Sequence, residues 1–162
     1  MDIYKAFKKY KLKIKGDQIY DPIREKFVHL TPEEKVRQQT LQYMINELEI
    51  PPEKIGVEIS LNSLGDVGNR KRIDICVFDN NEKVVAIVEC KANYIGYKEA
   101  PYNQAIDYVT SLGVYRYFVV DGYDMIGYYY NSLQDQFEKI EVLPHYQEML
   151  VIPTGLEPVF PA

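Results

Sequence analysis

The chain has few of the residues that build disulfide frameworks or zinc sites. It contains two cysteines and two histidines among 162 residues. Two cysteines are too few for a disulfide framework, and His29 and His145 stand too far apart in sequence to form a zinc motif. Cys76 and Cys90 both lie inside apolar runs, so we expect reduced thiols in the core. The composition therefore argues against a zinc enzyme.

Long apolar stretches are also missing. No run approaches the roughly 18 residues needed to cross a bilayer. The N-terminal stretch MDIYKAFKKYKLKIK lacks the apolar segment of a signal peptide. We therefore expect a cytoplasmic protein that has no membrane partner. With 46% hydrophobic and 27% charged residues, the composition is typical of a folded domain, and 162 residues are enough for one.

The charge balance gives a mixed indication about nucleic acids. The net charge of -5 does not favour binding to phosphates, yet residues 1–15 hold six lysines against one aspartate. These lysines could contact phosphates, or they could guard the exposed edge of a strand. A protein of negative net charge can still act on DNA when its positive charge is local to the binding surface.

Periodicity and turn residues predict alternating strands and helices. Gly16-Asp17 within KLKIKGDQIYD predicts a hairpin, which makes residues 1–30 a basic hairpin extension. Thr31, followed by Pro32 and Glu34, predicts the start of a helix that Pro51-Pro52 ends. The remaining predictions are strands over 55–61, 72–79, 83–90, 115–121, 125–130 and 135–142, a helix over 101–112, and an irregular tail over 146–162.

The order of these elements indicates the fold class. A strand–helix–strand unit with a short connection is expected to be parallel and right-handed. The strands at 83–90 and 115–121 should therefore run parallel within an otherwise antiparallel sheet. We expect an α/β fold with a mixed β-sheet flanked by helices, and residues 31–145 should form its core within a single domain.

Charged residues end the most apolar strand of the chain. Residues 84–88 of VVAIVECKA are all apolar, which is typical of a central strand buried on both faces. Glu89 and Lys91 follow. Because side chains alternate along a strand, these two share one face, and Cys90 points to the other. A buried strand that finishes with an acid and a lysine indicates a site, because unpaired buried charges are costly.

The preceding strand supplies a second acid, Asp74. A four-residue connection at 80–83 would set Asp74 opposite Glu89, whereas a two-residue turn would set it opposite Ile87. Both registers keep Asp74 on the face of Glu89, because only an odd shift exchanges faces. Two carboxylates held so close repel each other, and a divalent cation relieves the repulsion. Oxygen ligands favour Mg²⁺ or Mn²⁺ over zinc.

Both predicted helices carry polar side chains on the face that should pack on the sheet. In the first helix, the positions four and seven residues before Leu41 are Arg37 and Glu34. In the second, Gln104 lies four residues before Tyr108 and therefore on the same side. The apolar faces are marked by Leu41, Met44, Ile45 and Leu48 in the first helix and by Pro101, Ala105, Tyr108 and Leu112 in the second.

Each charged position also has an ordinary structural explanation. Glu34 could serve only as the acid of a capping box. Asp74 could pair with a basic neighbour, and Glu89 and Lys91 could form a surface pair where the strand leaves the sheet. Acids and a lysine that converge from separate elements nevertheless favour a functional site, because clustered titratable groups usually mark one.

The motif resembles a known nuclease core. Asp74 followed after a spacer by Glu89-Cys90-Lys91 is similar to the PD-(D/E)xK nucleases, and the order of helices and strands agrees with that core. Ile73 stands where the family name has proline. Neither side chain ligates a metal or moves a proton, so the difference leaves the expected chemistry intact.

A narrower resemblance covers roughly residues 19–145. The segments LTPEEKVRQ, RKRIDICVFD and VVAIVECKA, together with Gln104 and Tyr108, resemble the N-terminal nuclease domain of type I restriction enzyme R subunits. The chain also resembles short stand-alone versions of that domain. The acid-bearing helix before the motif and the Gln/Tyr helix after it make this resemblance specific.

The resemblance implies a role for each residue of the site. Asp74 and Glu89 would ligate Mg²⁺ or Mn²⁺ with the backbone carbonyl of Cys90, and Lys91 would orient or activate the attacking water. Glu34 would act as an accessory acid for a second metal ion or a water. Gln104 and Tyr108 would shape the site, and we expect contacts with phosphates from Arg37, Arg70, Lys71 and Arg72.

The expected function is that of a Mg²⁺-dependent DNA endonuclease. Two alternatives remain open: a nuclease-like fold that binds nucleic acid or a partner without cutting, and a subunit that cuts only with restriction–modification partners. The run Tyr128–Tyr130 could stack bases or form a strand with alternating burial. The sequence also leaves the oligomeric state open, a homodimer included.

Overall fold

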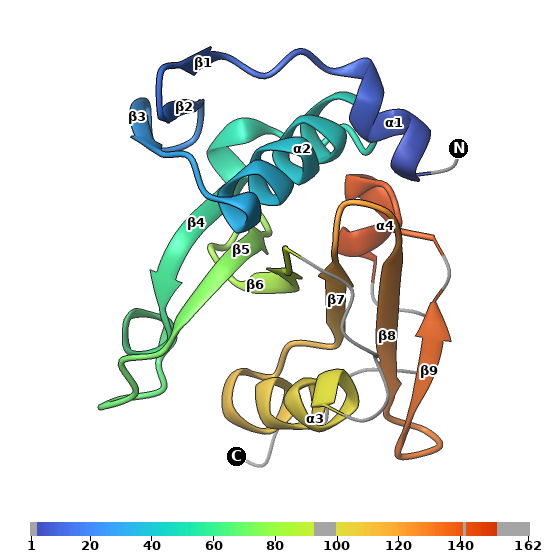
Figure 1. Cartoon of the computed structure of the whole chain (residues 1–162). Helices are drawn as coiled ribbons and strands as arrows, with labels where there is room; N and C mark the ends of the chain where they lie inside the picture. Colours follow the sequence, from blue (N-terminus) through green and yellow to red (C-terminus); the bar gives the residue numbers. More distant parts are fainter. Residues whose placement is uncertain (1–2, 93–99, 141, 152–162) are drawn as a thin grey trace.

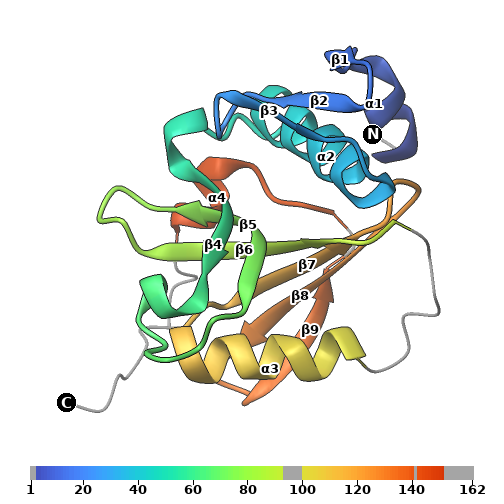
Figure 2. The ribbon, with the colours of Figure 1, turned by 60° about the vertical axis from the view of Figure 1, so that its left-hand side comes forward.

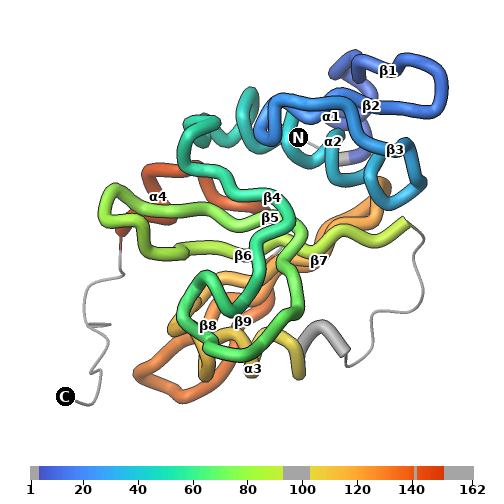
Figure 3. Tube along the Cα trace, turned by 90° about the vertical axis from the view of Figure 1, so that its left-hand side faces the viewer, coloured from blue at the N-terminus to red at the C-terminus, as the bar shows by residue number. Residues whose placement is uncertain are grey.

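A computed structural model describes residues 3–92, 100–140 and 142–151 of the chain. A six-stranded sheet forms its centre. Helices α2 (Pro32–Asn46) and α3 (Ala100–Leu112) lie on opposite sides of this sheet (Figure 1, Figure 2). Helix α1 (Ile3–Lys9) and a three-stranded antiparallel sheet lie beside α2 (Figure 3).

The central sheet confirms the predicted mixed architecture. Its strands follow the order β4-β5-β6-β7-β8-β9. β6 and β7 pair in parallel, and the other neighbours pair antiparallel. The parallel pair arises because α3 carries the chain from the end of β6 back to the start of β7. The strands are β4 (Ile55–Ser60), β5 (Arg72–Phe78), β6 (Val84–Cys90), β7 (Arg116–Val120), β8 (Met125–Asn131) and β9 (Gln136–Ile140).

The register of the sheet decides which acids meet. Ile75 of β5 lies opposite Val88 of β6, so the next position along sets Asp74 opposite Glu89. This is the first of the two registers that turn length left open. On the other side of β5, the register sets Glu58 of β4 opposite Asp74. Three neighbouring strands therefore each carry an acid at one level of the sheet.

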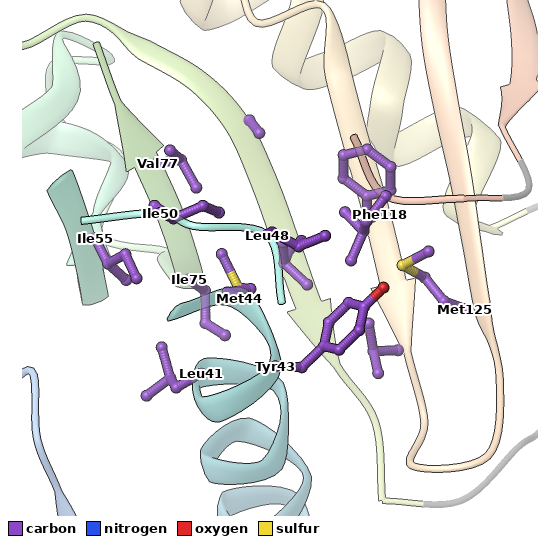
Figure 4. Close-up of a cluster of buried hydrophobic side chains, with 14 of the residues drawn as sticks. Leu41, Tyr43, Met44, Leu48, Ile50, Ile55, Ile75, Val77, Phe118 and Met125 are labelled. Carbon is purple, nitrogen blue, oxygen red and sulfur yellow. The ribbon is translucent and has the colours of Figure 1, made fainter. Parts of the chain in front are cut away.

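Helix α2 begins where the sequence predicts. The Thr31 side chain caps it by accepting a hydrogen bond from the Glu34 N–H at 3.0 Å. Pro32 stands in the first turn, where its missing N–H breaks no helical bond. Burial of a large apolar side chain stabilises the fold by roughly 1.5–3 kcal/mol. Figure 4 shows the core that α2 and the residues after it form with the sheet: Leu41, Tyr43, Met44, Leu48 and Ile50 against Ile55, Ile75, Val77, Phe118 and Met125.

Helix α3 covers the other face of the sheet. Its Ala105 and Tyr108 are buried with Ile87 and Cys76 in a second apolar cluster. Cys76 and Cys90 are both buried free thiols, as expected, and burial raises the pKa of Cys76 to about 12. Among the helices of the described residues, none combines enough length and apolarity to span a bilayer.

The N-terminal segment differs from the predicted hairpin extension over residues 1–30. The hairpin at Gly16-Asp17 is present, but it belongs to a three-stranded sheet, and a helix precedes it. Ala6 and Phe7 of this helix are buried in the core. Packing rather than local propensity holds so short a helix, which explains why its sequence did not predict it. The small sheet consists of β1 (Ile14–Lys15), β2 (Gln18–Asp21) and β3 (Lys26–His29).

The prediction of an irregular tail over 146–162 is wrong for the first residues of that segment. Helix α4 (Tyr146–Leu150) opens it, and Tyr146 and Met149 anchor this helix in the core. Residues 152–162 lie outside the described part of the chain. Two short 3-10 helices, η1 (Pro52–Lys54) and η2 (Leu61–Leu64), flank β4 in segments without a predicted helix.

Candidate active site

Asp74 and Glu89 form the centre of the site. The Asp74 carboxylate accepts a hydrogen bond from the Cys90 N–H at 2.7 Å, and the Glu89 carboxylate accepts one from the Tyr108 hydroxyl at 2.8 Å. The two residues are 8% and 5% exposed. Two carboxyl groups so close together and so buried cannot both carry a charge without compensation.

The environment of Glu89 resists its negative charge. Burial, then the charge of Asp74 and a hydrogen bond with that side chain, raise the pKa of Glu89 to about 8. The Tyr108 hydroxyl and the charge of Lys91 act in the opposite direction. Without a cation, the buried position beside Asp74 therefore favours the neutral form of Glu89. Such a pair of acids favours a cation that neutralises both.

A chain of hydrogen bonds supports Glu89 from behind. Gln104 donates from Nε2 to the Tyr108 oxygen at 3.2 Å, and the Tyr117 hydroxyl donates to Gln104 Oε1 at 2.9 Å. Burial, then the charge of Glu89, raises the pKa of Tyr108 well above its usual range, so Tyr108 remains a hydroxyl donor. The predicted shared face of Gln104 and Tyr108 is confirmed. Tyr117 of β7 was not predicted as a residue of the site, although the crossover that places its strand was.

Arg37 lies on the other side of Asp74, where three acids accept its hydrogen bonds and a fourth, Glu33, lies 3.9 Å away. Its Nη2 donates to Asp74 Oδ1 at 2.9 Å and to Glu58 Oε1 at 2.6 Å. Its Nη1 donates to Glu34 Oε2. The predicted inward positions of Glu34 and Arg37 are confirmed by exposures of 7% and 5%. A guanidinium that is buried on three carboxylates does not offer the expected contact with phosphate.

The Glu34 carboxylate is held from two elements. Its Oε1 accepts hydrogen bonds from Arg24 Nη2 at 2.5 Å and from Gln38 Nε2 at 3.0 Å. Arg24 lies in the turn between β2 and β3, and its Nε also donates to Asp21 at 2.6 Å. Glu34 therefore directs its carboxylate to two guanidinium groups, and it contributes its backbone N–H to the cap at Thr31.

Glu58 is a residue of the site that the sequence did not reveal. It has a φ of +56° inside β4, a left-handed conformation that is rare for a residue with a side chain. Such a conformation costs roughly 1–2 kcal/mol. The carboxylate contacts Arg37, and Arg72 Nη1 lies 3.6 Å from it. The one available signal was its register opposite Asp74.

Exposed positive charge borders the acids. Lys91 is exposed, and its N–H donates to the Val120 carbonyl at 2.8 Å, which extends the pairing of β6 with β7 by one residue. The loop before β5 carries Arg70 and Lys71, and Arg72 is the first residue of β5; all three are exposed. Lys71 Nζ lies 5.4 Å from the centroid of the Tyr108 ring. The loop therefore brings cations close to the Glu89 side of the site.

The donor set suits a hard divalent cation that keeps part of its water shell. Within the part of the chain that the structure describes, no group of three His, Cys, Asp or Glu side chains could hold a metal ion. Asp74 and Glu89 supply two carboxylates. Mg²⁺ in proteins is often held by one or two carboxylates and several waters. The two acids therefore fit Mg²⁺ or Mn²⁺.

A cavity of about 650 Å³ lies apart from these acids. It is bounded by the C-terminal end of α2, the β7–β9 strands and the segment around α4. Arg116 lines it and donates to the backbone carbonyls of Met149 and Glu148 at 3.1 Å and 3.3 Å. Its guanidinium thus holds the C-terminal end of α4, and the cavity contains none of the candidate site residues.

Comparison with known proteins identifies a family for most of the chain. The sequence model described as the type I restriction enzyme R protein N terminus matches residues 32–144. This range includes α2, the acids of β4, β5 and β6, and α3, whereas Asp21 and Arg24 precede it. No curated protein matches the chain.

Proposed function

The chain belongs to the family of the type I restriction enzyme R protein N terminus, and from this premise we propose that it is a metal-dependent deoxyribonuclease of the PD-(D/E)xK type. Membership connects the chain with restriction–modification systems. The observation that carries the proposal is the meeting of Asp74 and Glu89 on neighbouring strands, with Lys91 two residues further on. This arrangement provides a binding site for a cation with a lysine side chain beside it.

Each residue of the centre has a defined task in this proposal. Asp74 and Glu89 hold Mg²⁺ or Mn²⁺ together with the Cys90 carbonyl. When bound, such an ion supplies Lewis acidity for attack of water on a phosphodiester. Lys91 orients the water and balances the charge on the phosphate. Tyr108 keeps the Glu89 carboxylate in place through its hydrogen bond of 2.8 Å.

The exposed cations at the start of β5 are the proposed contacts with DNA. Lys71 adjoins the site through the Tyr108 ring and Arg72 through Glu58, and Arg70 directly precedes them; all three are exposed. Cations on such a loop bind phosphate oxygens without reading sequence. Binding through them should weaken with rising salt concentration, because each phosphate contact releases counterions.

Nicking of supercoiled plasmid tests the proposed activity. We expect the wild-type protein to nick DNA in Mg²⁺ or Mn²⁺ and to stop when a chelator is added. Asp74→Ala should abolish nicking, and its circular dichroism should show that the fold survives. Asp107→Ala is a matched control, because it removes an exposed acid of α3. Equal cleavage rates in the wild type and Asp74→Ala would count decisively against a nuclease.

A second candidate is a subunit that cuts only beside restriction partners. The family match favours it, because the R protein is by its description one component of a type I restriction enzyme. Calorimetric titration with Mn²⁺ separates this candidate from a module that has lost its chemistry. A subunit should bind Mn²⁺ through Asp74 yet leave plasmid intact on its own. A purely binding module should take up no ion.

A further inference from the structure

Arg37 occupies the space in which carboxylates from three elements converge. We propose that Arg37 is the resident counter-cation of the site. Its guanidinium neutralises negative charge on Glu34 and Glu58. Each chain therefore binds one divalent ion, at Asp74 and Glu89, and no second ion binds between α2 and β4. This inference rests on the proposed nuclease function and specifies how many ions that function uses.

The geometry of Arg37 matches that of a fixed cation. Nη1 donates to Glu34, and Nη2 donates to both Glu58 and Asp74, at 2.6 Å and 2.9 Å for the latter two. The residue is 5% exposed. A planar guanidinium with several donors suits carboxylates that approach from different directions. A divalent ion among these oxygens would have to displace the guanidinium or lie against it.

Glu34 is closed to a second ion on both of its oxygens. Arg37 binds Oε2, and Oε1 receives Arg24 and Gln38 at 2.5 Å and 3.0 Å. Arg24 is itself fixed by Asp21, which is fully buried and accepts its Nε at 2.6 Å. An ion at Glu34 would therefore meet two positive groups that are already held in place.

The backbone of β4 supports the same conclusion. Glu58 keeps a left-handed φ of +56° while its carboxylate contacts Arg37. A strained residue of this kind persists only when its surroundings hold it there, and such residues cluster at functional sites. A guanidinium with three carboxylate partners provides that hold.

Glu89 has a different set of neighbours. It receives the Tyr108 hydroxyl at 2.8 Å and faces Asp74 across the β5–β6 pair. A hydroxyl orients a carboxylate but carries no charge to balance it. Among the described residues, no cationic side chain donates a hydrogen bond to Glu89, and one divalent ion between Glu89 and Asp74 would supply the missing positive charge. Arg37 touches this pair through Asp74 Oδ1, so its positive charge stays next to the bound ion.

Counting bound Mn²⁺ tests the inference without reference to activity. Isothermal calorimetry on the wild type should give one Mn²⁺ per chain. Electron paramagnetic resonance of the saturated protein should show an isolated ion. Two ions in a shared site would lie about 4 Å apart and couple magnetically. Two ions per chain, or a coupled spectrum, would overturn the inference.

Two conservative variants sharpen the count. Glu34→Gln and Glu58→Gln should each keep one bound Mn²⁺, with a change in affinity below the roughly tenfold at which loss of an outer-shell partner becomes evident. Asp74→Asn should lose the ion. A stoichiometry of two in the wild type that falls to one in either glutamine variant would make that glutamate a ligand and sink the inference.

The outcomes also separate this inference from the function on which it rests. No bound Mn²⁺ together with no cleavage would reject the nuclease. Cleavage with two bound ions would leave the nuclease standing and reject only the role given to Arg37.

Discussion

The two sides of Asp74 handle buried negative charge differently. Toward α2 and β4, Glu34 and Glu58 each bind a guanidinium within hydrogen-bond distance. Toward β6 and α3, Glu89 receives a tyrosine hydroxyl, and its pKa is raised to about 8. Glu34 and Glu89 are almost equally buried, at 7% and 5% exposure. Burial alone therefore does not distinguish the two acids; the difference lies in the charge of their partners, and only the second side leaves an acid for a divalent ion.

Removal of the Arg37 guanidinium should change the free energy of unfolding more than any other substitution proposed for the two sides of Asp74. Arg37→Met leaves three acids without their common partner, and loss of one member of a buried ion pair typically costs about 3–5 kcal/mol. We expect the free energy of unfolding in urea to fall by that amount at neutral pH. Lys35→Met is the matched control, because Lys35 is exposed on the same helix. A loss below about 1 kcal/mol would show that the acids are compensated in another way.

The pH dependence of stability should reveal the charge of Glu89, on the other side of Asp74. Glu89 has a raised pKa of about 8 in the folded protein, against an ordinary value of 4.5. Between these two values the folded chain keeps a proton that the unfolded chain has released. Stability in the presence of chelator should therefore fall as pH rises from 4.5 through 8, because the unfolded state binds fewer protons there.

Replacement of Glu89 isolates this contribution. Glu89→Gln should flatten the decline and should be more stable than the wild type at pH 9, because it carries no charge that burial and Asp74 oppose. Glu138→Gln, an exposed acid of β9, should leave the decline unchanged. Parallel profiles for the wild type and Glu89→Gln between pH 5 and 9 would show that Glu89 does not titrate there.

The sequence predicted the Glu89 side of the site better than the Arg37 side. Strand alternation placed Asp74 and Glu89 on one face for either length of the turn, and helical spacing did the same for Gln104 and Tyr108. These are local relations with fixed periods. The parallel pairing of β6 and β7 followed from an equally general rule about crossovers.

The residues that were missed come from elements whose placement depends on packing. Arg24 reaches Glu34 from a turn of the small N-terminal sheet, and Glu58 reaches Arg37 through a left-handed backbone inside a strand. No periodic pattern predicts either contact. Helix α1 was missed for a related reason, because Ala6 and Phe7 stabilise it only by contact with the core. Glu34 and Arg37 were placed correctly, but their partners were not foreseen.

The strain at Glu58 can be measured by two substitutions that differ only in their Cβ. Both Glu58→Ala and Glu58→Gly remove the contact with Arg37. At a φ of +56°, glycine avoids the steric penalty, so Glu58→Gly should be the more stable of the two by about 1 kcal/mol. The same pair at Glu138 is the control, and there glycine should be the less stable. The same order at both positions would mean that β4 adopts an ordinary strand conformation at Glu58.

The smallest predicted effect concerns the hydroxyl on the Glu89 side. Tyr108→Phe removes the hydrogen bond to Glu89 and should cost about 1 kcal/mol. The hydroxyl lowers the pKa of Glu89, so its loss should raise that pKa further, which carboxyl NMR titration can follow. Tyr123→Phe, at a residue that is 66% exposed, is the control. An unchanged Glu89 pKa would mean that the hydroxyl only fills space. A higher Glu89 pKa would show that the hydroxyl stabilises the carboxylate charge. On this side of Asp74 a neutral donor would then provide part of the stabilisation that a guanidinium provides on the other.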